Sequence, residues 1–391
     1  MKKMAYFGML LLAAVMLAAC GAGAVDIQEK EAVTFDIPDT IGRSLTWKSS
    51  LELDYAAGFA VDYYTCDKTD CPYKLLSVAQ EAQYLVIPQG EKAPEDVPDD
   101  IVIVKSPQKI YLVASQVMDM FAALGAMERL RFSALDADSW YIREAKEHMA
   151  DGSLLYAGKY SAPDYELIVE EECDLAIENT MIYHTPQVKE KLESFGIPVI
   201  VDRSSYEEHP LGRTEWVKLY GALTNREKEA EQAFLEQVDT YRAVAAKERE
   251  DAPTVAFFYI AENGSVKVRK SKDYLPKMIE MAGGRYLFEH LGEEEESASS
   301  TVNMQMEEFY AAAKDADYFI YNSTIEGELK NVQDLLDKSE LLAQCKAVQE
   351  GNVYCTSQNL YQSTMELGTI ISDINRMLTD ADGMTYIYPL K

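Results

Sequence analysis

Apolar and polar residues follow two different patterns along the chain, and the change falls near Pro107. Between about Leu51 and Val104 apolar residues alternate with polar ones, which is typical of β-strands, and polar turns fall at residues 66–72 and 90–99. After Pro107, short apolar runs alternate with segments whose apolar residues recur every three or four positions. This second pattern predicts α/β organisation with a mainly parallel sheet.

The segments after Pro107 form two series that are separated by a long helical stretch. Residues 226–250 contain neither Gly nor Pro and predict one helix of about 37 Å, at about 1.5 Å per residue. In each series an acidic residue, Glu166 or Glu308, opens a helix that leads into a buried strand. We therefore expect two α/β lobes with the same local plan, joined by one long helix rather than by a flexible hinge.

The first 23 residues have the pattern of a lipoprotein signal. Lys2 and Lys3 precede an apolar run, too short to span a bilayer comfortably, that ends in Leu-Ala-Ala-Cys at Cys20. This ending resembles the lipobox of bacterial lipoproteins, in which the cysteine carries diacylglycerol and the peptide is cut before it. We expect a signal peptide over residues 1–19 and lipid anchoring of Cys20 to the cell membrane, outside the cytoplasm. An ordinary signal peptide with an incidental cysteine is the alternative.

The charge of the chain excludes one class of partner. The formal net charge is −29, and removal of the signal with its two lysines leaves −31, from 35 basic and 66 acidic residues. Such a chain repels phosphate backbones, so we expect no nucleic-acid partner. An anionic ligand would need a local basic pocket. No second apolar run is long enough to cross a bilayer, so the lipid would be the membrane attachment.

The six cysteines allow several arrangements. Cys66 and Cys71 are close in sequence, so a local disulfide is plausible outside the cytoplasm, and Cys345 and Cys355 could pair in the same way. Cys173 lies in an apolar stretch and is expected to be a buried free thiol. A zinc site at Cys66 and Cys71 is a weaker alternative, because no second pair has metal-ligand spacing.

Four segments together resemble the substrate-binding proteins of ABC importers for iron–siderophore complexes, haem and cobalamin, the class III periplasmic binding proteins. Between about Pro107 and Leu378 they come in the order QKIYLVASQVMDMFAALG, APDYELIVEEECDLAIEN, YEEHPLGRTEWVKLYG and MIEMAGGRYLF. The resemblance implies two Rossmann-like α/β lobes joined by a single long rigid α-helix, with a ligand cleft between them. It also implies a monomer without catalytic activity or cofactor, which delivers a metal-chelate ligand to an ABC permease.

These observations divide the chain into five parts. The β-rich segment 51–104 is longer than the simplest members of the family show and is assigned to the first lobe. The expected parts are a signal peptide (1–19), a lipid-anchored leash (20–47), an N-terminal lobe (48–225), a linking helix (226–250) and a C-terminal lobe (251–391).

The resemblance also implies one exposed glutamate on each lobe that docks onto arginines of the permease. Glu166 matches the position in the first lobe, and Glu308 best matches it in the second, with Glu307 adjacent. Two exposed carboxylates at a fixed separation suit recognition by paired guanidinium groups. The alternative is that both are ordinary acids at helix starts, where the helix dipole favours them.

Ligand contacts are expected from loops at the C-terminal ends of strands, where the lobes face each other. Aromatic faces would stack on a flat ligand, Lys and Arg would offset carboxylates or catecholates, and Met181 with His184 could bind haem iron axially. Each of these residues also has a purely structural alternative. The candidates are Trp140, Tyr141, Lys159, Tyr160, Met181, His184, Arg213, Tyr259, Lys267, Arg269, Asn322 and Tyr361.

Two other functions fit the sequence less well. A receptor for bare Zn²⁺ or Mn²⁺ needs several converging His and carboxylate ligands, and the chain has four His and no His-rich loop. An anchored enzyme lacks support because there is no GxSxG, HExxH or Walker motif. Hydrolysis by paired carboxylates stays open, since acids are plentiful.

Overall fold

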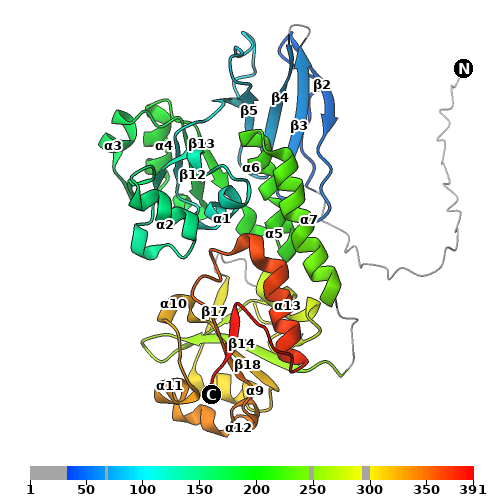
Figure 1. The fold of residues 1–391 in the computed structure, drawn as a ribbon, viewed down its shortest axis with the longest axis vertical. Coiled ribbons are helices and arrows are strands. Elements are labelled where there is room, and N and C mark those ends of the chain that lie inside the picture. Colours follow the sequence, from blue (N-terminus) through cyan, green and yellow to red (C-terminus); the bar gives the residue numbers. More distant parts are fainter. Residues whose placement is uncertain (1–32, 67–68, 246–250, 293–299) are drawn as a thin grey trace, which may run out of the picture. The chain divides into compact units, whose positions relative to one another are not determined.

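The computed structural model describes residues 33–66, 69–245, 251–292 and 300–391 (Figure 1). The expected signal peptide and the anchor at Cys20 lie outside these residues. None of the helices in the described part is long and apolar enough to cross a membrane.

A six-stranded sheet, called the added sheet here, precedes the first lobe. Its strands pair in chain order, antiparallel from β1 to β5 and parallel between β5 and β6. One face packs into the main core with Phe59 and Leu76, and the other buries a separate cluster with Tyr64 and Leu85. The strands are β1 (Thr40–Ile41), β2 (Leu45–Ser50), β3 (Phe59–Cys66), β4 (Thr69–Val78), β5 (Gln83–Ile87) and β6 (Ile101–Lys105).

The expected β-rich segment is therefore present, but it begins earlier than predicted. β1 and the start of β2 fall within the segment 20–47 that was expected to be a leash, so that expectation is wrong from residue 40 onward. The reason is that β2 buries only Leu45 and exposes its other five residues, which removes the apolar alternation that marks a strand.

The first lobe has the parallel sheet that the pattern predicts, in the order β13-β12-β7-β8-β9. Pro186 starts α4 and Gly196, with φ +79°, follows its end, as is common at the two ends of a helix. The strands are β7 (Ile110–Leu112), β8 (Leu130–Ser133), β9 (Leu155–Tyr156), β12 (Leu175–Asn179) and β13 (Val199–Asp202); β10 (Gly158–Lys159) and β11 (Ala162–Pro163) form a separate hairpin. The helices are α1 (Ser115–Ala123), α2 (Arg143–Ala150), α3 (Tyr165–Glu170) and α4 (Pro186–Ser194).

Three helices lead from the first lobe to the second: α5 (Pro210–Glu215), α6 (Val217–Thr224) and α7 (Glu227–Val244). The 18 residues of α7 span about 27 Å. Of the helix predicted over 226–250, α7 ends at Val244, because Ala245 leaves the helical conformation with ψ 113°; residues 246–250 lie outside the described part. Figure 1 shows α7 beside α13 of the second lobe, and the two helices are in contact. A Cβ at Gly368 of α13 would lie 2.4 Å from the Gln237 carbonyl oxygen of α7, so the approach requires glycine.

The second lobe contains a mixed sheet rather than a mainly parallel one. β14 pairs in parallel with β16 and β18, and β18 with β19, whereas β15, β17 and β20 pair antiparallel. The strands are β14 (Thr254–Ile260), β15 (Val266–Arg269), β16 (Arg285–Tyr286), β17 (Thr301–Met304), β18 (Tyr318–Tyr321), β19 (Val353–Thr356) and β20 (Ile387–Pro389). The helices are α8 (Tyr274–Met281), α9 (Met306–Ala313), α10 (Ser323–Glu326), α11 (Val332–Lys338), α12 (Lys346–Glu350) and α13 (Leu367–Leu378).

The cysteines that the structure describes are free thiols. Cys345, just before α12, and Cys355, within β19, are both buried and unpaired, so the disulfide that the sequence left open between them is not formed. Cys66 is free as well, so the bridge to Cys71 that the sequence allowed is not formed either; the side chain of Cys71 lies outside the described residues. Cys173 is a buried free thiol, as predicted.

Candidate functional site

A cavity of about 490 Å³ is lined by residues of both lobes. In the first lobe its lining follows the C-terminal ends of β7, β12 and β13, which is where parallel α/β sheets place ligands. The first lobe supplies Ser115, Gln116, Thr180, Ser205, Tyr206, Glu207, Glu208 and Arg213. The second lobe supplies Arg269, Lys270, Lys272, Asp273, Tyr274, Ser300 and Tyr361.

Four cationic side chains line this cavity in a protein whose net charge is −29: Arg213, Arg269, Lys270 and Lys272. Two of the three acids in the lining are already engaged. Glu207 accepts hydrogen bonds from backbone N–H groups and an indole, and Asp273 caps α8 and pairs with Arg269 at 3.3 Å. Four cations against three acids give the lining a formal charge of +1, so the cavity is locally positive in a strongly acidic chain, which favours an anionic ligand.

Arg269 is held by several side chains of the second lobe. Its Nη1 donates to Ser300 Oγ at 2.7 Å and to Asp273 Oδ2, and its Nη2 donates to the Tyr361 hydroxyl. Asn322 Nδ2 also donates to that hydroxyl, at 2.8 Å. These contacts fix the guanidinium plane at the end of β15, so it is presented to the cavity with little freedom.

Arg213 joins the two lobes across the cavity. It comes from α5, and its guanidinium carbon lies 3.8 Å from the ring centroid of Tyr274 in α8. Its Nη1 donates to the Ser205 carbonyl oxygen at 3.3 Å. Burial raises the pKa of Tyr274, and the two nearby arginines, Arg213 and Arg269, oppose that rise. The ring therefore stays a neutral platform for a cation.

A fully buried carboxylate behind the cavity holds the first-lobe part of the lining. Asp202, at the end of β13, accepts hydrogen bonds from Gln116 Nε2 at 2.7 Å, from Ser204 Oγ at 2.6 Å and from Tyr220 OH at 2.6 Å. Burial raises the pKa of Asp202, and these donors offset part of the rise. The bonds keep Gln116 and the turn after β13 in place.

Among the candidates from sequence, Arg213, Arg269 and Tyr361 line the cavity, and Asn322 contacts Tyr361. Trp140 does not, because its side chain is 1% exposed in the core and donates to Ser133 Oγ. The expectation that its ring stacks on a ligand is therefore wrong for this structure.

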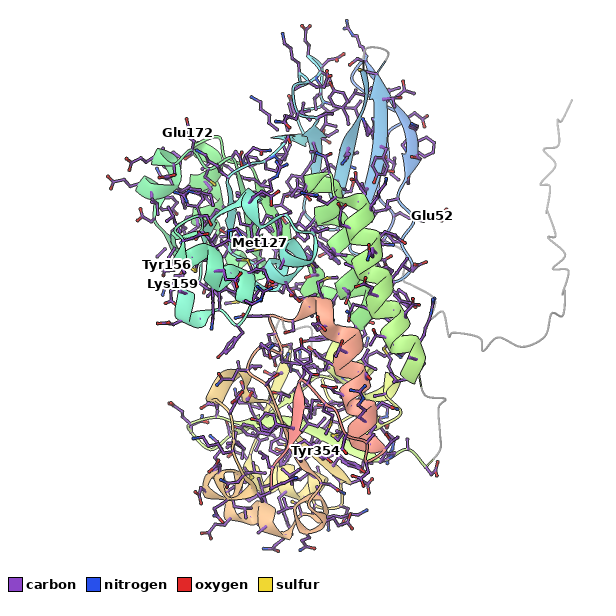
Figure 2. The ribbon with its side chains drawn as sticks, in the orientation of Figure 1. Glu52, Met127, Tyr156, Lys159, Glu172 and Tyr354 are labelled. Carbon is purple, nitrogen blue, oxygen red and sulfur yellow. The ribbon has the colours of Figure 1, made fainter. Side chains whose placement is uncertain are left out.

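The other candidates lie outside the cavity lining. Tyr259 and Lys267 pair in register on β14 and β15. Tyr141 is exposed and bonds across the lobes, its N–H donating to Gln362 Oε1 at 2.9 Å and its hydroxyl to Gln358 at 2.5 Å. The rest lie on the first lobe: Lys159, which projects from it in Figure 2, the half-buried Tyr160, and the exposed Met181 and His184.

Sequence reasoning missed most of the polar lining, including Lys270, Lys272 and Tyr206. A signal for the two lysines was available, because residues 267–272 contain four basic residues within six in an otherwise acidic chain. Ser205, Tyr206 and Glu207 gave no such signal, because their place in the cavity depends on how a loop and a short 3₁₀ turn are folded after β13.

The acids expected to dock onto a permease are exposed at helix starts in both lobes. Glu166 is the second residue of α3 and follows the capping residue Asp164, whose side chain accepts from Leu167 N–H. In α9, Glu307 is the second residue and Glu308 the third, and both are exposed. Glu307 therefore occupies the same position in its helix as Glu166 does, whereas the sequence pattern favours Glu308 as the docking residue of the second lobe.

The sequence model of the family described as "Periplasmic binding protein" matches residues 112–360, which is more than half of the chain. The chain belongs to the periplasmic binding protein family. Proteins of this family bind and deliver substrates, so this periplasmic binding protein is not an enzyme. The matched region begins after the added sheet and ends before α13.

The chain also resembles a relative of known sequence and several solved structures. An uncharacterised lipoprotein of Methanocaldococcus jannaschii is 25% identical over 97% of this chain and 93% of its own length. The periplasmic haem-binding protein HutB of Vibrio cholerae has a TM-score of 0.55 at 19% identity, over 68% of this chain and 98% of its own. A chain of an ABC-type Fe³⁺-hydroxamate transport system from Saccharomonospora viridis has a TM-score of 0.51 at 17% identity, over 69% and 92%. At these identities the solved structures show the shared fold.

Proposed function

We propose that this periplasmic binding protein is the lipid-anchored receptor of an ABC importer and that it captures an anionic iron chelate, a ferric siderophore or haem, for delivery to the permease. The observation that carries the proposal is the cavity between the lobes, with four cationic side chains in a strongly acidic protein. A corrinoid is the third ligand of the family resemblance and is less favoured by this charge.

The chemistry of the lining suits carboxylate or catecholate groups around a bulky centre. Arg213 and Arg269 each offer planar N–H donors, which match two oxygens of a carboxylate or catecholate at once. Tyr206 and Tyr361 add aromatic surface beside them. The volume of about 490 Å³ lies within the range of small-molecule sites.

Supporting evidence for location comes from the signal pattern and from the archaeal relative, which is itself a lipoprotein. We propose that Cys20 carries the lipid and that residues 20–39 tether the folded part. Glu166 on one lobe, with Glu307 or Glu308 on the other, would contact arginines of the permease. Because α7 packs against α13, we expect only small lobe movements on binding.

The soluble form, residues 21–391, tests the proposal by titration with haemin, cyanocobalamin, a ferric hydroxamate and a ferric catecholate. Trp216 is a suitable fluorescent reporter, because its Nε1–H donates to Glu207 Oε1 in the cavity wall at 2.9 Å. We expect quenching and a raised Tm with at least one iron chelate and weaker binding by Arg269→Gln. Arg143→Gln, an exposed change on α2, is the matched control. Absence of quenching and thermal shift with every probe would refute the proposal.

The alternative of a bare Zn²⁺ or Mn²⁺ receptor has weaker support. Within the ranges that the structure describes, no three or more His, Cys, Asp or Glu side chains converge as a metal site would need. Metal analysis of the protein purified without chelator separates the alternatives, since stoichiometric zinc or manganese would favour the ion receptor.

A further inference from the structure

The added sheet is attached to the wall of the cavity at two separate places, and its own role is not assigned by the family, whose matched region starts at residue 112. The wall is defined here as residues 203–213, which supply five of the lining residues. It consists of a three-residue 3₁₀ turn, Ser204–Tyr206, a short loop and the start of α5. Such a segment has few hydrogen bonds of its own, so its position depends on its neighbours.

The first attachment joins the loop between β2 and β3 to carboxylates in and next to the wall. Glu207 accepts from the backbone N–H groups of Ala57, at 3.1 Å, and of Gly58, at 2.8 Å. Glu215 accepts from three more N–H groups, those of residues 54–56, at 2.7–2.8 Å. The Tyr55 ring also stacks on His209 with centroids 4.6 Å apart.

There is no spare room at this attachment. A Cβ at Gly58 would lie 3.0 Å from Glu207 Oε1 and 3.0 Å from the Trp216 ring. A Cβ at Gly212, in the wall itself, would lie 3.3 Å from the Tyr55 carbonyl oxygen. The loop of the added sheet and the wall are therefore packed in direct contact as well as hydrogen-bonded.

The second attachment is the tip of the β4–β5 hairpin. Arg203 Nη2 donates to Gln80 Oε1 at 2.9 Å, and Glu81 pairs with Lys189 at 3.4 Å and with Arg203 at 3.9 Å. The guanidinium of Arg203 then lies over the ring of Tyr206, 4.6 Å from its centroid. The hairpin thus reaches a lining residue through one intervening side chain.

From these contacts we infer that the added sheet is part of the binding site, because it holds the wall in the position from which Tyr206 and Arg213 meet the ligand. Glu207 and Arg203 are the positioning residues. The inference rests on the proposed function only for the identity of what binds. Its physical basis is preorganisation, since a wall already held in place loses less conformational freedom when a ligand binds.

The test compares two variants that act at different attachments. Glu207→Gln keeps the shape of the side chain but replaces one acceptor oxygen by a donor. Gln80→Ala with Glu81→Gln weakens the contacts of the hairpin tip with Arg203 and Lys189. Glu190→Gln, exposed on α4, is the matched control. Without ligand, we expect faster amide hydrogen exchange of residues 203–216 in both variants, together with Ala57 and Gly58 in Glu207→Gln because their N–H groups lose an acceptor, and unchanged exchange in the control.

A second measurement is the affinity for haemin at a temperature well below the Tm of each protein. At that temperature all variants are folded, so a loss of global stability alone would leave the affinity unchanged. We expect binding about tenfold weaker in the variant with Gln80→Ala and Glu81→Gln than in the control, because neither of these residues lines the cavity and no charge of the lining changes. Unchanged exchange of residues 203–216 in both variants would overturn the inference, as would loosened exchange with unaltered haemin affinity. If the unmodified protein binds none of the four titration probes, the proposed function fails, while the exchange experiment still decides whether the sheet holds the wall.

Discussion

Glu178 offers the sharpest test of the energetics in the first lobe. It lies on β12, its side chain is 0% exposed, and no described group bonds either carboxylate oxygen. Burial alone raises its pKa to about 8 from an ordinary value of 4.5. A buried carboxyl without hydrogen-bond partners stays protonated at neutral pH. The unfolded protein releases this proton and the folded protein must keep it, and this difference lowers the free energy of unfolding.

The size and sign of the effect follow from proton linkage. Below pH 4.5 both the folded and the unfolded protein carry the proton, so ionisation costs nothing. Between pH 4.5 and about 8 only the unfolded state ionises, and the folded state loses about 1.4 kcal/mol of relative stability per pH unit. The stability is therefore greatest at low pH and falls as pH rises through this window, by up to about 5 kcal/mol.

The perturbation is Glu178→Gln, which keeps the shape and removes the ionisation. Urea unfolding at pH 5, 6.5 and 8 should show the variant gaining on the unmodified protein, by about 4 kcal/mol between the first and last pH. Glu170→Gln, exposed on α3, is the control and should show no such trend. A stability difference that stays constant across these pH values would refute the argument that Glu178 is neutral and uncompensated.

Three further predictions concern the contacts between lobes and the partner. Gly368→Ala should lower stability by about 1–3 kcal/mol in urea unfolding, since its Cβ would meet the Gln237 carbonyl oxygen at 2.4 Å; an unchanged midpoint would contradict that packing. Burial raises the pKa of Asp119, which accepts from Met365 N–H at 2.7 Å, to about 7, so the unmodified protein loses stability from about pH 4 to 7. Asp119→Asn should therefore raise the Tm more at pH 7 than at pH 5, and an equal shift would argue against it. Glu166→Lys should abolish uptake by cells while ligand affinity persists, and unchanged uptake would reject the docking assignment.

The hydrophobic pattern was sufficient for the elements whose burial is regular. After Pro107 the apolar spacing predicts alternating strands and helices. The elements that follow this alternation, because each buries one face or a complete short run, are β7, α1, β12, α4, β13 and β14. β2 escaped detection because it exposes nearly all of its residues, and the end of α7 was placed too late because no Gly or Pro marks it. The apolar pattern does not reveal a strand that is mostly exposed, such as β2, nor a helix end that is set by the ψ angle of one residue, such as Ala245.

The site was predictable only where chemistry is visible in a single residue. Arg213, Arg269 and Tyr361 could be selected because a cation or an aromatic ring near a strand end is chemically conspicuous. Trp140 was selected for the same reason and is buried instead, because Ser133 provides a partner for its indole N–H inside the core. Glu207 could not be found, since its role depends on N–H groups about 150 positions earlier in the chain.

The pairing of Glu207 and Glu215 with residues 54–58 limits how this protein can be shortened or compared. A fragment that begins at residue 112, where the family match starts, would lack the five backbone N–H groups of residues 54–58. The buried carboxylates of Glu207 and Glu215 would then lose these hydrogen-bond donors, which lowers stability. The two acids and the distant loop thus depend on each other for their hydrogen bonds. Among relatives, glutamates at both positions should mark chains that also carry the added sheet, even where the sequence of the sheet itself has diverged beyond recognition.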